Sequence, residues 1–323
     1  MQDGRRSPRT YEEYTVIVVC TIELEMSAVR YILDIEHRSL LIKEGDFNIY
    51  ILGVLKGHNV VLACLPGNQG KGSAAIITIH IARTFPSIKV PSNKHNIRLG
   101  DVMVSMPEGQ YGGVVQYDLR KETDDSFVLK GFLSPPPPLL RGAIVKIQSD
   151  HLVSENKAEE FLLAILQRGR RLSIYRRPSA DLNNFICTKC DQQKSVLRLR
   201  REFEGPEIYY GLIASGDRVM RNTAKRSEVI RNIDNILCFE IEAAGLITEF
   251  SCIIIRGISD YTDSHKNNNW QHYAAITAAT CTKELLSYID PEVASAIPVP
   301  SIDVASNQDN RLATYHIFHS KGV

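Results

Sequence analysis

Three neighbouring segments indicate the fold: Cys238-Phe239-Glu240-Ile241-Glu242-Ala243-Ala244-Gly245, Phe250-Ser251-Cys252-Ile253-Ile254-Ile255 and Arg256-Gly257-Ile258-Ser259-Asp260-Tyr261. The middle run is apolar and has the length of a buried strand. A helix start rich in carboxylates is expected before this strand, and Asp260 follows just past its C-terminal end. Ligands of open α/β sheets bind at such strand ends. Three carboxylates near one crevice suit chemistry that needs a proton donor and acceptors for hydroxyl groups.

Strands and helices alternate along the rest of the chain, which favours an α/β sandwich with a mixed sheet. Further strands are expected at 14–20, 48–54, 59–65, 101–106 and 208–214. Helices are expected at 22–33, 70–84, 139–148, 153–166, 227–232 and 272–288. Four consecutive prolines at 135–138 form a stiff connector, because proline fits neither a helix interior nor a central strand.

The composition is that of an ordinary globular protein. The chain has 323 residues, 44% hydrophobic and 23% charged, with a net charge of +1, which gives no global reason to expect nucleic acid or a membrane as partner. No apolar run reaches the ~20 residues needed to span a bilayer, and the polar start is no secretory signal. Seven scattered cysteines favour reduced thiols and a cytoplasmic location. We expect a disordered lead-in at 1–13, one domain at 14–290, and a linker or disordered tail at 291–323.

Residues 168–201 form a basic insertion in which Asp181 and Asp191 are the only acids. It is either an anion-binding patch or a solvated loop, and the scarcity of aromatic residues for base stacking favours the loop. The insertion contains Cys187-Thr188-Lys189-Cys190, which is at most half of a zinc site, since no second pair lies at the customary spacing. We therefore predict no metal and no cofactor.

Four other segments agree, in order, with one known pattern: 16–25, 67–72, 97–105 and 210–217. With the two acidic motifs they resemble the nucleoside phosphorylase and nucleosidase family, which includes methylthioadenosine/S-adenosylhomocysteine nucleosidase. The nearest resemblance is to the N-terminal domains of fungal NOD-like receptor proteins. The resemblance covers residues 14–290 and implies a phosphorylase/hydrolase-like three-layer α/β/α sandwich with a mixed central sheet.

The resemblance implies roles for three carboxylates. Asp260 is the acid that protonates the leaving purine, Glu25 positions and activates a water, and Glu242 accepts hydrogen bonds from the ribose hydroxyls. Each has a plainer alternative. Asp260 fits a turn or helix cap, Glu25 favours the helix dipole in a first turn, and Glu242 fits a capping position.

The other implied site residues are expected to hold the substrate. Arg256 and Ser259 would hold Asp260 and the base edge, and Val219 and Met220 would flank the base. Ile241 packs against the sugar, and Glu240 orients its motif. Ser215 belongs to the motif at 210–217, and Gly70 to a glycine segment whose amides suit an anion, although close helix–strand packing explains the glycines equally well.

One departure from the family pattern stands out between 85 and 97. Family members have an apolar central strand and a glycine-rich turn there, and this chain lacks both. Either the sheet is locally weak around Ile17, Val61 and Val102, or 88–90 moves in as a short substitute strand.

Two functions follow from the resemblance. The first is purine-nucleoside N-glycosidic cleavage by a nucleosidase or phosphorylase, with a nucleoside as the small-molecule partner. Phosphate as a second partner and a homo-oligomer as the assembly stay open. The second is a catalytically impaired sensor or interaction domain of a receptor-type protein. Retained Glu25, Glu242 and Asp260 favour the first, and the missing glycine turn favours the second.

Overall fold

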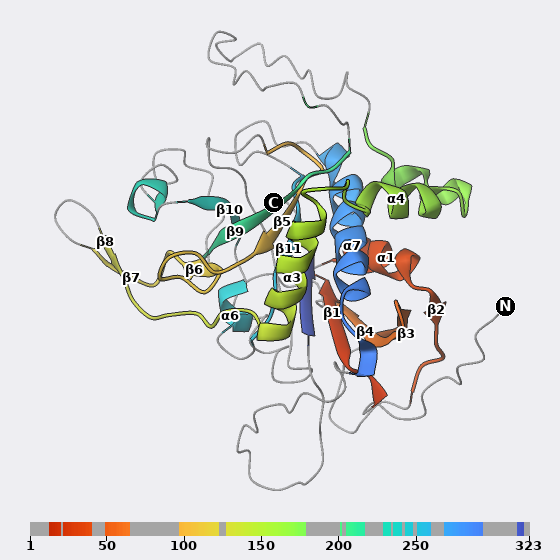
Figure 1. Cartoon of the computed structure of the whole chain (residues 1–323), viewed down its shortest axis with the longest axis horizontal. Helices are drawn as coiled ribbons and strands as arrows, with labels where there is room; N and C mark the ends of the chain where they lie inside the picture. Colours follow the sequence, from red (N-terminus) through yellow and green to blue (C-terminus); the bar gives the residue numbers. More distant parts are fainter. Residues whose placement is uncertain are drawn as a thin grey trace, which may run out of the picture.

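A computed structural model gives the fold of the chain (Figure 1). It describes residues 13–20, 22–40, 49–64, 97–122, 127–178, 201, 205–216, 229–233, 235–240, 243–247, 251–259, 268–292 and 315–319. All structural statements below concern these residues.

The first sheet has five strands in the order β12-β1-β4-β3-β2. Its central pair, β1 (Val16–Cys20) and β4 (His58–Cys64), runs parallel, and β3 (Tyr50–Leu55) and β2 (Ile35–Glu36) follow in antiparallel order. The β3–β4 hairpin turns on Lys56 and Gly57, which have φ of 52° and 85°. A two-residue hairpin loop with two positive φ angles matches the right-handed twist of the strands it joins.

The second sheet has the order β10-β9-β5-β11. In it β10 (Ile236–Glu240), β9 (Ile208–Ser215) and β5 (Val102–Ser105) are parallel, and β11 (Ile255–Gly257) is antiparallel to β5. The short β6 (Val114–Gln116) also pairs with β9. A separate hairpin of β7 (Arg120–Glu122) and β8 (Phe127–Leu129) projects from this side of the molecule (Figure 1).

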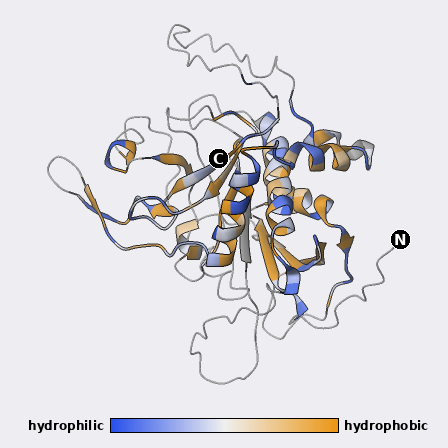
Figure 2. Cartoon of the chain, viewed as in Figure 1, coloured by the Kyte–Doolittle hydropathy of each residue, from blue (hydrophilic) through white to orange (hydrophobic). Residues whose placement is uncertain are grey.

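Two hydrophobic cores lie on opposite faces of these sheets. In β1, Val16, Val18 and Cys20 belong to one core, and Ile17 and Val19 belong to the other, as the period of two in a strand requires. Figure 2 shows β1 as hydrophobic throughout and α3 as mixed, which is the pattern of a strand buried on both faces and a helix buried on one. The result is the expected α/β/α sandwich.

The helices divide between the two faces. The first core holds buried side chains of α1 (Glu23–Ile32), α3 (Pro138–Asp150), α4 (Ala158–Leu166) and α7 (Gln271–Ser287), whereas α6 (Ala243–Ile247) packs into the second. Two short 3₁₀ helices cover Arg170–Tyr175 and Asn268–Trp270. Among the described helices, none combines the length and apolar character that crossing a bilayer requires.

Most of the expected elements are confirmed to within two residues, and two elements differ by more. The helix expected at 153–166 begins only at Ala158, whose N–H donates to Asn156 Oδ1 over 3.1 Å, and Leu152 and Val153 are exposed. The strand expected at 250–255 is β11, at Ile255–Gly257. Before it, the Ile254 N–H donates to Ser105 Oγ, so a side chain takes the place of a ladder partner. The expected helix at 70–84 lies outside the described residues.

The largest difference concerns the expected tail. Residues Tyr315–His319 are not part of a tail but form β12, which pairs with β1 in parallel register from Val16↔Tyr315 to Cys20↔His319. This strand is the violet arrow beside β1 in Figure 1. It also packs against β11 and α7. The residues expected as a substitute strand, 88–90, lie outside the described part of the chain.

The basic insertion is fixed to the second sheet at its last residue. Arg201 donates to both carboxylate oxygens of Asp101, over 2.8 and 2.6 Å, and pairs with Glu207 at 2.8 Å. The Asp101 carboxylate also accepts the N–H groups of Arg98 and Glu207. Asp101 precedes β5, and Glu207 precedes β9, so the network joins the starts of two neighbouring strands. The Cys187–Cys190 pair lies outside the described residues.

Candidate active site

Glu25 lies in the first turn of α1, directly after β1. Its side chain is only 1% exposed, in contrast to Glu23 in the same turn, which is exposed. Burial raises the pKa of the neighbouring Cys20 thiol well above its usual value, and the negative charge of Glu25 raises it further. Cys20 is therefore a neutral thiol and no nucleophile. A helix dipole alone does not explain why Glu25 is buried, because first-turn acids serve that purpose at the surface.

Ser215 and Glu240 are brought together at the carboxyl ends of two parallel strands. Ser215 ends β9, Glu240 ends β10, and the two residues are partners in the ladder. The Ser215 Oγ accepts a hydrogen bond of 2.9 Å from the Ala244 N–H in α6. Since α6 follows the Glu240–Glu242 motif, this bond fixes the backbone on both sides of that motif. Ser215 thus has a structural role that the sequence did not indicate.

Arg256 and Ser259 lie in and just after β11 and are 1% and 2% exposed. Arg256 pairs with Met103 of β5 in the ladder, and the Ile258 N–H donates to the Asp101 carbonyl. A guanidinium buried to this degree needs an acceptor with charge or strong polarity. The chain therefore keeps a buried cation four residues before Asp260 at considerable desolvation cost.

Gly257, in the middle of the second motif, is explained by packing. A Cβ at this position would overlap the carbonyl group of Ala274 in α7. Gly100 is similar, with φ of 89° and the ring of Tyr273 against its Cα. These contacts press β11 and the start of β5 closely against α7.

The remaining residues predicted from the sequence lie outside the described part of the chain. They are Asp260, Glu242, Ile241, Val219, Met220 and Gly70, and for Glu240 only the backbone is described. Their roles stay predictions. Among the described residues, no group of three or more His, Cys, Asp and Glu is arranged to hold a metal ion.

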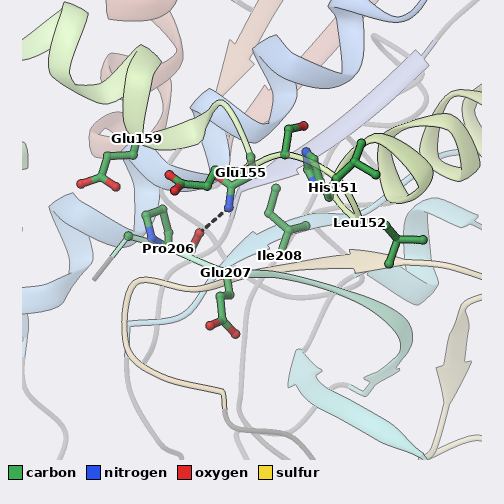
Figure 3. Close-up of a pocket in the computed structure, with 11 residues that line it drawn as sticks. His151, Leu152, Glu155, Glu159, Pro206, Glu207 and Ile208 are labelled. Carbon is green, nitrogen blue, oxygen red and sulfur yellow. Dashed lines mark hydrogen bonds between the residues drawn. The ribbon is translucent and has the colours of Figure 1, made fainter. Parts of the chain in front are cut away.

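A pocket of about 610 Å³ opens elsewhere, between the α3–α4 connection and the segment before β9 (Figure 3). Figure 3 shows the carboxylates of Glu155, Glu159 and Glu207 around it, and a hydrogen bond of 2.8 Å from Asn156 Nδ2 to the Pro206 carbonyl. None of the predicted site residues that the structure describes lines this pocket. It lies at the amino end of β9, whereas ligands of α/β sheets bind beyond the carboxyl ends.

Sequence reasoning missed β12, whose last residue, His319, is the ladder partner of Cys20. The signal was present in Tyr315-His316-Ile317-Phe318-His319, because aromatic and β-branched residues are enriched in strands. A five-residue run isolated in a Pro- and Ser-rich segment did not stand out from its surroundings.

Comparison with solved structures supports the fold. The chain superposes on the 5′-methylthioadenosine/S-adenosylhomocysteine nucleosidase of Neisseria meningitidis, in complex with methylthio-immucillin-A, with a TM-score of 0.54 and 18% identity over 85% of this chain and 99% of that one. The Streptococcus pneumoniae enzyme with a transition-state inhibitor gives 0.52, with 16% identity over 85% and 99%. Futalosine hydrolase of Helicobacter pylori gives 0.52, with 13% identity over 87% and 100%. The chain therefore has the nucleosidase fold.

Comparison of sequences adds one curated relative. A nucleotide-binding leucine-rich repeat (NLR)-like protein of Hyaloscypha variabilis is 35% identical over an alignment of 323 positions that covers 95% of this chain. The chain spans about a third of the length of this relative, 32%. No family model matches the chain.

Proposed function

We propose that this chain, which has the fold of the 5′-methylthioadenosine/S-adenosylhomocysteine nucleosidases, cleaves the N-glycosidic bond of a purine nucleoside. The observation that carries the proposal is the agreement of two independent features. The fold matches nucleosidase structures over almost their whole length, and Glu25 is a buried carboxylate directly after β1. Burying a carboxylate costs free energy, so its retention in the interior favours a role beyond solubility.

In the proposed mechanism two carboxyl groups divide the work, as in glycoside hydrolysis. Asp260 donates a proton to a ring nitrogen of the purine, which makes the base a better leaving group. Glu25 orients a water and takes its proton as the water attacks the sugar from the opposite face. Glu242 accepts hydrogen bonds from the 2′- and 3′-hydroxyls of the ribose, and the other product is free ribose.

The described residues support the placement of this machinery. Ser215 and the backbone of Glu240 order the approach to Glu242, through the ladder and the bond to Ala244. Arg256 and Ser259 are buried just before Asp260. Arg256 suits a role as the charged partner that keeps this strand end in place, because guanidinium groups form strong hydrogen bonds to carboxylates.

The test is a panel of substrates. Purified protein is incubated with adenosine, inosine, guanosine and 5′-methylthioadenosine, each with and without phosphate, and released base and sugar are quantified. Release of base with free ribose, independent of phosphate, supports hydrolysis. If ribose 1-phosphate is the main product, the attacking nucleophile is phosphate and not water. No release from any of the four nucleosides overturns the proposal.

A second candidate function rests on the NLR-like relative, which is about three times as long as this chain. In this alternative the chain is a ligand-sensing domain of a receptor-type protein and binds a nucleoside without turning it over. Binding of adenosine or adenine to the full chain by calorimetry, in the absence of base release, is the result that this alternative predicts. Under either function we propose a small-molecule nucleoside as the ligand and the cytoplasm, which keeps thiols reduced, as the location.

A further inference from the structure

The slot between β1 and β11 is filled by a strand from the far end of the chain. The first sheet ends at β12, which lies next to β1, and the second sheet ends at β11. β12 pairs with β1 along all five residues and packs against β11 and α7. No ladder between β12 and β11 is present among the described strands. β12 thus pairs with β1 and lies against β11 without a ladder to it.

The position next to β1 must be filled by another strand, because β1 is buried and its backbone groups need partners. All five residues of β1 are buried. Without β12, the edge of β1 would present N–H and C=O groups to an apolar interior, at about 1–3 kcal/mol for each group left without a partner. The chain also lacks the apolar strand expected before Ile97. A strand supplied by residues 315–319 removes that deficit.

The register of β12 determines what it brings to the site. β12 is parallel to β1, so the carboxyl ends of the two strands lie side by side, with His319 opposite Cys20. Glu25 lies in the helical turn that follows this edge, close enough to Cys20 to influence its pKa. Ligands of α/β sheets bind beyond this edge.

We propose that β12 completes the candidate active site: its backbone pairs with β1 on the side away from β4, and its carboxyl end at His319 forms a wall of the site beside Cys20 and Glu25. The identity of the substrate rests on the function proposed above, whereas the placement of the strand does not. The site is then assembled from the first and last strands of the described chain.

The placement is tested by a cross-link that uses a native thiol. Neighbouring strands lie about 4.8 Å apart, within the range of Cα separations that a disulfide spans. Cys20 is a free thiol, and Cys64 is its ladder partner on the other side. The variant is therefore His319→Cys in a Cys64→Ser background, oxidised at alkaline pH because burial raises the pKa of the Cys20 thiol. The matched control is His316→Cys in the same background, since residue 316 pairs with Ile17.

The expected result is a disulfide within one molecule between Cys20 and the cysteine introduced at 319, identified by mass spectrometry of the digested protein. It should form at least tenfold faster than any disulfide between Cys20 and the cysteine introduced at 316. Equal rates in the two variants, or cross-links only between molecules, overturn the placement of β12.

The contribution of β12 to the site is tested by removing this strand from the chain and adding it back as a peptide. The chain is ended after Thr314, and a synthetic peptide of residues 311–323 is added. A lower melting temperature and at least a tenfold loss of nucleoside cleavage are expected, both restored by the peptide. A peptide with Ile317→Pro and one with His316→Pro are the controls. Since N–H groups alternate in direction along a strand, one of these prolines removes a donor to β1.

The two tests separate failure of this inference from failure of the proposed function. If the intact protein cleaves no nucleoside, the proposed function is wrong, and the cross-link still decides where β12 lies. If the intact protein is active and the shortened chain is equally active without peptide, β12 forms no part of the site. If the shortened chain fails to fold, Ile317→Pro and His316→Pro in the full chain replace it, and an unchanged kcat/KM in both variants contradicts the role of the strand.

Discussion

The carbonyl group of Ala274 in α7 lies directly against the Cα of Gly257 in β11, in a space that no Cβ can enter. This contact joins the longest described helix to the strand that carries Arg256 and leads to Asp260. The glycine of the second acidic motif therefore serves helix–strand packing, and the position of Arg256 depends on it.

We predict that Gly257→Ala destabilises the protein by an amount at or above the upper end of the ~1–3 kcal/mol typical of overpacking, because the obstacle is backbone that cannot rotate away. Thermal or urea unfolding measures the change. The control is Gly142→Ala in α3, where a Cβ meets nothing within 4 Å and helix propensity favours alanine by up to about 1 kcal/mol. Equal effects of the two substitutions would show that β11 and α7 are not in close contact.

Glu25→Gln should lower turnover by roughly 10²–10⁴ if Glu25 acts on the attacking water, the usual range for a general base. The amide has nearly the shape of the carboxylate, so the melting temperature should change little. Glu23→Gln, in the same turn but exposed, should leave turnover within about twofold of the original. A similar loss in both variants would point to the helix dipole.

Asp260→Asn should lower turnover by a similar factor of roughly 10²–10⁴, since an amide has no proton to donate to the leaving base. Substrates whose base leaves easily without protonation should lose much less. Asp263→Asn, three residues further along, is the control for changes in local charge. If the Asp260→Asn variant is as active as the original protein, Asp260 is not the acid.

Two serines allow a structural role to be separated from a role in the site. Ser215 Oγ accepts the Ala244 N–H, and Ser105 Oγ accepts the Ile254 N–H, each over 2.9 Å and each buried. Replacement by alanine leaves a buried N–H without this acceptor, which costs about 1–3 kcal/mol in either case. Only Ser215→Ala should also weaken substrate binding, seen as a raised KM. A raised KM in both variants would mean that destabilisation alone is responsible.

Acid should destabilise the protein through His58. Its Nε2–H donates to the carbonyls of Leu286 and Ile289, at 3.2 and 3.1 Å, and Nδ1 has no hydrogen-bond partner among the described residues. Burial lowers the pKa of His58 below its ordinary 6.5, although both carbonyls and Asp290 act in the opposite direction. The unfolded chain therefore binds a proton first as the pH falls. The contribution of His58 to the free energy of unfolding should be constant above about pH 6.5. It should decrease as the pH falls from that value to the lowered pKa of His58 in the folded protein.

The measurement is the melting temperature from pH 8 to pH 5 for the original protein and for His58→Gln. Glutamine retains an N–H donor but does not titrate in this range. A shallower dependence on pH is expected for the variant, whatever its stability at pH 8. Burial lowers the pKa of His37 and His272 as well, so some dependence should remain. Identical slopes would assign the acid sensitivity to other groups.

Local patterns in the sequence were sufficient for most of the scaffold. A continuous apolar run predicted β1, and alternating residues predicted β3 and β4. The amphipathic run after Trp270 predicted α7 within one residue at each end. These signals are local, since burial on one face or on both imposes its own period on a single element. The fold that the acidic motifs implied is the one observed, whereas the chemistry assigned to these strand ends stays a prediction.

Contacts between distant segments could not be read in this way. The exposed or buried state of Glu23 and Glu25, two residues apart, depends on how α1 packs, and the bond from Ala244 to Ser215 depends on the pairing of β9 with β10. The clearest case is β12. The sequence predicted an α/β sandwich that lacks a central strand. The absence of an apolar run between 85 and 97 is a local feature, so it can be seen without the structure. Only the tertiary structure decided that residues 315–319 occupy the slot, because a five-residue strand gains its stability from the neighbours that receive it and not from its own sequence.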